Sequence, residues 1–171
     1  IQLFDETGNV IPSDMCCVAL HNVFKCSFSD DQSFSSPVFN NPLFPTMDPI
    51  IIDWVGITKL IENLKVSAPG PDEITAQFLK CTVTHSSIIL SKLFKQSLEC
   101  GVLPNDWKVG KVVPIPKQGN PSCAINYRPI SLTSIPGKLL EHIIFSNLVL
   151  FLESNNFFSK YQHGFRKKFS M

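Results

Sequence analysis

The chain has 171 residues, enough for about one domain of ordinary size. Apolar residues make up 44% of it and charged residues 17%, a composition that excludes a highly charged, intrinsically disordered protein. The net charge of +1 conceals an uneven distribution, because residues 1–64 carry a net charge of −6 and residues 107–171 carry +7. A basic segment of this kind favours a polyanionic partner.

The N-terminal half predicts several helices separated by turns. A first helix falls within Asp14–Phe28, and a polar, proline-rich loop or linker extends from Asp30 to Pro49. The spacing of apolar residues predicts a helix over 57–64, then a turn over 67–72, where Asp72 caps a helix over 73–80. A longer helix over 85–100 presents one apolar face and ends at Gly101; the face comprises Leu90, Leu93, Phe94 and Leu98.

The pattern changes after Trp107. β-Branched residues predict a strand over 109–115, and Pro114 and Pro116 favour an edge position for it. Residues 127–132 are predicted to return as the second strand of a hairpin. After a break at Pro136-Gly137, a long helix over 138–153 is predicted to bury one stripe, formed by Leu140, Ile143, Ile144, Leu148, Phe151 and Leu152. The fold class is therefore α+β and helix-rich.

Cysteine usage and hydropathy bear on the compartment. None of the six cysteines forms a C-x-x-C pair, and the chain shows no signal peptide, which favours reduced, buried thiols over a secreted disulfide framework. The longest apolar run, Ile143–Leu152, is interrupted by Ser146 and Asn147 and is short for a membrane span. We therefore expect a soluble intracellular protein, cytoplasmic or nuclear, with no membrane partner.

Simple catalytic patterns are absent from the sequence. It contains neither a Gly-rich phosphate loop nor an H-E-x-x-H motif. After Trp107 only Glu141 and Glu153 are acidic, and both fall on one predicted helix. Two-metal chemistry needs carboxylates that converge on the ions, so we assign neither a catalytic nor a metal-binding residue.

The basic segment offers candidates for anion binding. If the hairpin forms, Lys117 and Arg128 can both reach one anion near its tip, with Arg128 supplying a planar fork and Lys117 a point charge. Further on, residues 164–168 place Phe165 beside three cations, which suits backbone contact combined with base stacking. Solvated edge residues and a basic tail without a specific role remain the alternatives.

A set of short motifs in a fixed order resembles a known family. The chain is similar over about residues 50–170 to the amino-terminal part of the reverse transcriptase of non-LTR (LINE-like) retrotransposons. The matching motifs are Ala68-Pro69-Gly70-Pro71-Asp72-Glu73-Ile74, Phe78-Leu79-Lys80, Gly101-Val102-Leu103-Pro104-Asn105-Asp106-Trp107-Lys108, Val112-Val113-Pro114-Ile115-Pro116-Lys117, Asn126-Tyr127-Arg128-Pro129-Ile130-Ser131-Leu132, Lys138-Leu139-Leu140-Glu141 and Gln162-His163-Gly164-Phe165-Arg166.

The resemblance implies a partial right-hand polymerase. Residues 50–171 would form the fingers and the start of the palm, preceded by a poorly ordered N-terminal helix and polar linker over 1–49. Arg128 would contact the nucleoside triphosphate, and Lys117 would assist it or the template. The template site would include Gln162, Gly164, Phe165 and Arg166. The implied partners are an RNA template, a DNA primer, deoxynucleoside triphosphates and the missing palm and thumb.

The catalytic Asp motifs of that family do not occur in this sequence. In the full-length family they hold Mg²⁺, so we expect this fragment to bind no metal and to have no polymerase activity alone. A non-enzymatic nucleic-acid-binding remnant is the alternative function, since it would use the same residues. A general α/β protein with fortuitous motifs is the third possibility, and the order of the motifs disfavours it.

Overall fold

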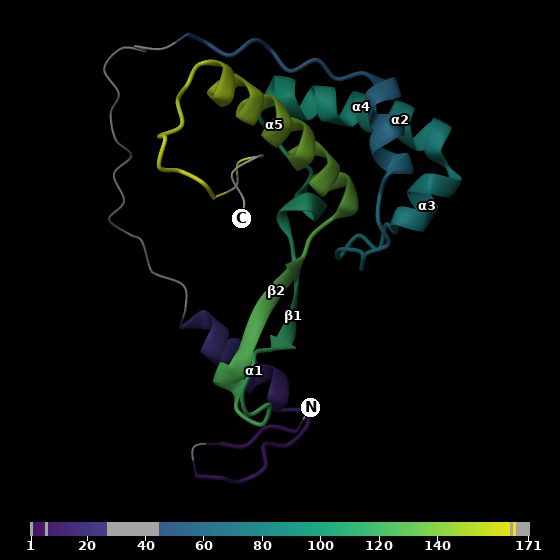
Figure 1. Cartoon of the computed structure of the whole chain (residues 1–171). Helices are drawn as coiled ribbons and strands as arrows, with labels where there is room; N and C mark the ends of the chain where they lie inside the picture. The colour runs from purple at the N-terminus through teal and green to yellow at the C-terminus, as the bar shows by residue number, and fades with distance from the viewer. Residues whose placement is uncertain (1, 6, 27–44, 165, 167–171) are drawn as a thin grey trace. The chain divides into compact units, whose positions relative to one another are not determined.

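The computed structural model describes residues 2–5, 7–26, 45–164 and 166. It is an α+β structure, as expected, in which helices predominate over one antiparallel pair of strands (Figure 1). Its elements are α1 (Cys16–Lys25), α2 (Trp54–Glu62), α3 (Ala76–Cys81), α4 (Val83–Cys100), η1 (Asn105–Lys108), β1 (Lys111–Pro116), η2 (Ala124–Asn126), β2 (Tyr127–Leu132) and α5 (Ile135–Ser154).

The chain divides into two compact units. One, here called the hairpin unit, combines Ile1–Asn41 with Gly110–Leu132, and the other, the helical unit, combines Pro42–Val109 with Thr133–Met171. Residues far apart in sequence therefore share a unit. The proposed division into 1–49 and 50–171 concerns domain organisation along the sequence, and it stays a prediction.

The helical unit is built around apolar side chains from four helices, α2 to α5. Phe94 of α4 lies at its centre with no exposed surface, and its ring meets Trp107 edge-on at 5.7 Å between centroids. Truncating a fully buried Phe to Ala typically costs about 3–5 kcal/mol. The other members of this core are Ile57, Ile61, Ala76, Leu79, Leu90, Ile135, Leu139 and Leu140.

Local signals explain where these helices begin and end. The side chains of Asp53 and Thr75 accept backbone N–H bonds at the starts of α2 and α3. Gly101 adopts the left-handed conformation (φ 66°) that ends α4, which confirms the predicted stop. The face predicted for α4 is correct at Leu90 and Phe94, but Leu93 is 39% exposed.

Asp72 does not cap the helix assigned to it, because α3 begins at Ala76 under the cap of Thr75. Its carboxylate instead accepts a hydrogen bond of 2.6 Å from the hydroxyl of Ser134, 62 residues away. Ser134 is fully buried and caps α5 by accepting the Gly137 N–H at 3.2 Å. The turn that contains Asp72 is thus fastened to the beginning of α5.

α5 begins earlier than predicted. Pro136 lies in its first turn, where a missing N–H costs nothing, so it does not break the helix. The predicted stripe is buried at Leu140, and Ile143 and Ile144 pack against the core, but Leu148 is 42% exposed. Among the described helices, α5 alone is long and apolar enough to span a membrane by length and composition. The helix is longer than the uninterrupted apolar run within it, which explains the difference from the sequence prediction, and core helices of soluble proteins meet the same criterion.

The cysteines differ from expectation in their burial. Cys16 is buried, and its thiol lies 3.8 Å from the Ile11 carbonyl. The thiols of Cys17, Cys26, Cys81 and Cys100 are exposed, so predicted burial is wrong for these four.

Candidate nucleic-acid interface

The β1–β2 hairpin places three cationic side chains on one face. Ile115 pairs directly with Arg128, and Lys111 pairs with Leu132. Paired residues share a face of an antiparallel ribbon, as do residues two apart on a strand. Lys111, Lys117 and Arg128 therefore project from the same face, and all three are exposed.

Three prolines fit the ribbon because of its hydrogen-bond alternation. The Lys117 N–H donates to the Asn126 carbonyl at 2.7 Å, which makes this a hydrogen-bonded pair. Alternation along an antiparallel ladder then places Pro114, Pro116 and Pro129 at positions whose nitrogens point away from the partner strand. A residue without an N–H loses nothing there. The hairpin and the edge character of its first strand are confirmed.

The loop end of the hairpin is held by residues from the N-terminal segment. Tyr127 packs with Leu3, Cys16 and Leu20 in a second buried cluster. Its hydroxyl donates to the Pro121 carbonyl at 2.8 Å. Tyr127 lies on the opposite face of the ribbon from Arg128, its neighbour in sequence. One face is therefore anchored at this end while the cationic face stays open.

Lys117 and Arg128 differ in how far they are engaged. The Lys117 ammonium donates to the Ile125 carbonyl at 3.1 Å across the loop that joins the strands. The Arg128 side chain makes no hydrogen bond or ion pair with another described residue, although its backbone pairs with Ile115 in the ladder. Lys117 therefore stabilises the loop while it remains exposed. The Arg128 guanidinium is accessible to a ligand.

Of the C-terminal motif, the structure describes Gln162, His163, Gly164 and Arg166, while Phe165 lies outside the described residues. Gln162 and Gly164 are exposed. Arg166 forms a two-pronged ion pair with Glu153 of α5, from Nε to Oε1 at 2.9 Å and from Nη2 to Oε2 at 2.8 Å. Sequence reasoning missed Glu153 as a partner, since the two residues are 13 positions apart.

The ion pair shifts both titrations. The hydrogen bond from Arg166 is the main cause that holds the pKa of Glu153 below its ordinary value. The same bond raises the pKa of Arg166. Both groups therefore remain charged over a wide pH range.

The predicted site residues fall into both units. Lys117 and Arg128 belong to the hairpin unit, whereas Gln162, Gly164 and Arg166 belong to the helical unit. Lys117 and Arg128 are brought to one face by the register of the strands, and Gln162 and Arg166 are brought together by the loop after α5, where Arg166 Nη1 lies 3.4 Å from the Gln162 carbonyl.

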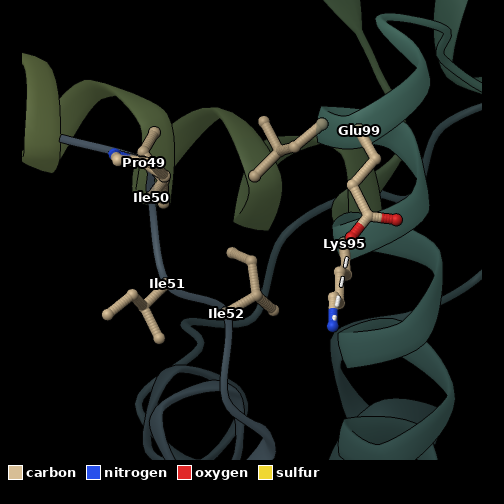
Figure 2. Close-up of a pocket in the computed structure, with 7 residues that line it drawn as sticks. Pro49, Ile50, Ile51, Ile52, Lys95 and Glu99 are labelled. Carbon is tan, nitrogen blue, oxygen red and sulfur yellow. Dashed lines mark ion pairs between the residues drawn. The ribbon is translucent and has the colours of Figure 1, made fainter. Parts of the chain in front are cut away.

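A cavity that the sequence does not signal lies within the helical unit. It has a volume of about 580 Å³ and is bounded by the segment 49–52 and by α4. Figure 2 shows this isoleucine-rich segment opposite Lys95 and Glu99, whose ion pair measures 3.9 Å. The isoleucines make the walls of the cavity apolar. Both charged side chains are exposed at the rim, where they form an ordinary surface ion pair.

Acidic and other metal-ligating side chains are dispersed in the part of the chain that the structure describes. No three His, Cys, Asp or Glu side chains lie close enough together among them to hold a metal ion. Mg²⁺ prefers carboxylate, phosphate and water oxygens in octahedral geometry.

Comparison with known proteins shows which proteins this chain is similar to. Over the matched residues, the chain is homologous to RNA-directed DNA polymerases of non-LTR retrotransposons, which confirms the resemblance carried by the motifs. No family model matches the chain.

Three relatives show the extent of the similarity. The chain is 30% identical over 112 residues to the RNA-directed DNA polymerase from mobile element jockey of Drosophila melanogaster, a match that covers 64% of this chain. It is 31% identical over 108 residues to the probable RNA-directed DNA polymerase from transposon X-element of the same species. It is also 31% identical over 88 residues to the Pol polyprotein from the type-1 retrotransposable element R2 of Popillia japonica. Each match spans 12% of the relative's length.

Proposed function

We propose that this chain is the template- and nucleotide-handling part of a retrotransposon reverse transcriptase and acts together with the remainder of the polymerase. The observation that carries the proposal is the hairpin face, which presents Lys117 and Arg128 outward in a chain that matches an RNA-directed DNA polymerase over 112 residues. In these relatives the matched segment is one small part of a much longer protein.

Arg128 is the proposed contact to the incoming nucleotide. A guanidinium binds phosphate oxygens through two parallel N–H bonds, and it stays charged at any working pH. Ile115 opposite it in the ladder fixes the position of its backbone. Lys117 is the proposed second cation, directed to the triphosphate or the template, and its bond to the Ile125 carbonyl limits how far it moves.

Gln162, Gly164 and Phe165 are the proposed template contacts. The exposed Gly164 has no neighbouring atom within 4 Å of where a Cβ would lie, so a nucleic-acid backbone can approach closely. Mg²⁺, the primer terminus and the chemical step belong, in this proposal, to the palm of the full-length protein. The 171-residue chain alone is accordingly expected to be inactive.

Titration with a fluorescent deoxynucleoside triphosphate in the presence of an RNA–DNA primer–template tests the proposal. Removing a charge-assisted bond typically costs about 1.5–3 kcal/mol, so Arg128→Ala should weaken nucleotide binding roughly tenfold or more. Lys92→Ala on α4 removes an exposed cation elsewhere and is the matched control. Equal nucleotide affinity for Arg128→Ala and wild type would refute the assignment.

Two further readouts separate the proposal from its alternative. A binding remnant would hold the primer–template and show no nucleotide binding that depends on Arg128. Primer extension by the chain alone with Mg²⁺ or Mn²⁺ should give no incorporation. Extension above background would overturn the predicted inactivity.

A further inference from the structure

The loop that follows α5 folds back on the end of that helix. Asn156 takes the left-handed conformation (φ 55°), which reverses the chain. The Phe157 N–H then donates to the Leu152 carbonyl at 3.0 Å, and its ring lies 5.7 Å from that of Phe151. The fold-back brings the residues before Gln162 alongside α5.

Arg166 closes this loop through several contacts at once. Its guanidinium pairs with both carboxylate oxygens of Glu153, and its Cζ lies 5.0 Å from the centre of the Phe158 ring. Nη1 is also 3.4 Å from the carbonyls of Ser159 and Gln162. The Arg166 side chain is only 11% exposed, against 37% for Glu153. A guanidinium committed in this way has little left to offer a phosphate.

We infer that Glu153 is a positioning residue for the template site: by holding Arg166, it fixes the segment 159–164 in the shape that presents Gln162 and Gly164. Arg166 is then an anchor within the chain and not a phosphate contact. This inference rests on the proposed function for its template, but the anchor itself rests on contacts within the helical unit alone.

Two roles of Arg166 predict opposite effects of Glu153→Gln. If Arg166 is an anchor, losing its carboxylate partner loosens the loop and weakens template binding. If Arg166 contacts phosphate directly, Glu153 competes with that phosphate, and its neutralisation tightens binding. Arg166→Lys separates the roles as well, since lysine keeps the charge but loses the fork.

Limited trypsin digestion of the 171-residue chain reports on the anchor, because Lys160 is an exposed cleavage site inside the loop. Fluorescence anisotropy with a labelled RNA–DNA primer–template reports on binding. For Glu153→Gln and for Arg166→Lys, cleavage after Lys160 should accelerate about threefold to fivefold, and affinity should fall by a similar factor. Exchanging the charges in Glu153→Arg/Arg166→Glu should restore much of the resistance to cleavage.

Glu99→Gln is the matched control, since it removes a carboxylate from the exposed pair with Lys95. It should alter neither readout. Unchanged cleavage in Glu153→Gln, or tighter primer–template binding by that variant, would overturn the inference. If the wild-type chain binds no primer–template, the proposed function fails along with the binding half of this inference, whereas accelerated cleavage of Glu153→Gln still establishes the anchor.

Discussion

Gly70 shows how a single residue serves the fold within a motif that resembles a polymerase signature. A Cβ at this position would lie 2.5 Å from the Ser134 nitrogen and 2.6 Å from the Thr133 carbonyl carbon. These atoms are backbone and cannot move aside cheaply. Two residues further on, the Asp72 carboxylate accepts a hydrogen bond from the hydroxyl of the fully buried Ser134. Through these contacts of Gly70 and Asp72, the turn before α3 packs tightly against the start of α5.

Gly70→Ala should destabilise the helical unit. Overpacking at a close approach typically costs about 1–3 kcal/mol, because the turn must separate from Thr133 and Ser134. Urea denaturation followed by tryptophan fluorescence measures the change, since Trp107 reports on this core. Gly164→Ala is the control, as open space surrounds that position, and it should stay within about 0.5 kcal/mol of wild type. A Gly70→Ala variant as stable as Gly164→Ala would contradict the proposed close contact.

The ion pair of Glu153 also predicts a pH dependence. Its pKa is lower in the folded chain than in the unfolded one, chiefly because Arg166 donates a hydrogen bond to it. Such a carboxylate stabilises the fold above its unfolded pKa, and this contribution disappears as the pH falls through the lower folded value. The difference in unfolding free energy between wild type and Glu153→Gln should thus shrink on acidification. In an Arg166→Gln background the same comparison should show no such trend.

At the scale of elements, the hairpin is protected against pairing with other strands. Among the described residues its sheet contains β1 and β2 alone. Outward positions on an edge strand normally offer free N–H groups, and these invite a further strand. Pro114 and Pro116 remove two such donors from β1, and Pro129 removes one from β2. The ribbon can therefore display an apolar and cationic face without extending its sheet.

Replacing Pro114 and Pro116 together with valine should promote self-association. The substitution restores two outward N–H groups and raises β propensity, so that β1 can pair with a strand of a second copy of the chain. Sedimentation velocity over a concentration series measures the effect. Ile115→Val, at an inward hydrogen-bonded position, should behave as wild type. A double variant that stays monomeric at the same concentrations would show that the prolines have no such role.

Elements with a clear local signal were predictable from the sequence. The apolar period revealed α4, Gly101 its end, and β-branched residues with prolines the hairpin. Contacts between distant residues left no local signal. Asp72 was assigned to the nearest helix because its partner Ser134 lies 62 residues away, and Glu153 was left without a partner. The packing of Leu3 and Cys16 on Tyr127 is likewise a long-range contact. At the candidate site, the hairpin pattern sufficed to bring Lys117 and Arg128 to the same hairpin, whereas no local pattern signals the contact between Arg166 and Glu153. The binding roles of these residues stay predictions.

At the scale of the whole molecule, the proposed function accounts for both the charge distribution and the exposed apolar surface. The last 65 residues carry a net charge of +7, and the ion pair with Glu153 engages Arg166, one of their basic side chains. The second half of α5 exposes Phe145, Leu148 and Leu150, at 53%, 42% and 67%. The relatives are about eight times longer than the matched segment, since it spans 12% of their length. Under the proposed function, the remainder of the polymerase covers these apolar residues and leaves the cations for nucleic acid.

The cations of the hairpin should therefore make nucleic-acid binding strongly dependent on salt. Each phosphate contact releases bound counterions, so the logarithm of the affinity falls linearly with the logarithm of the salt concentration. Losing one contact reduces the slope by about 0.7–0.9. Lys117→Ala should reduce the slope by that amount in anisotropy titrations with labelled RNA at several KCl concentrations. The same variant should weaken binding to all RNA sequences alike, because a phosphate contact carries no base information. Lys92→Ala, an exposed lysine on α4, should leave the slope unaltered. If both variants keep the wild-type slope, Lys117 does not contact phosphate and the cationic face is not the binding surface at that position.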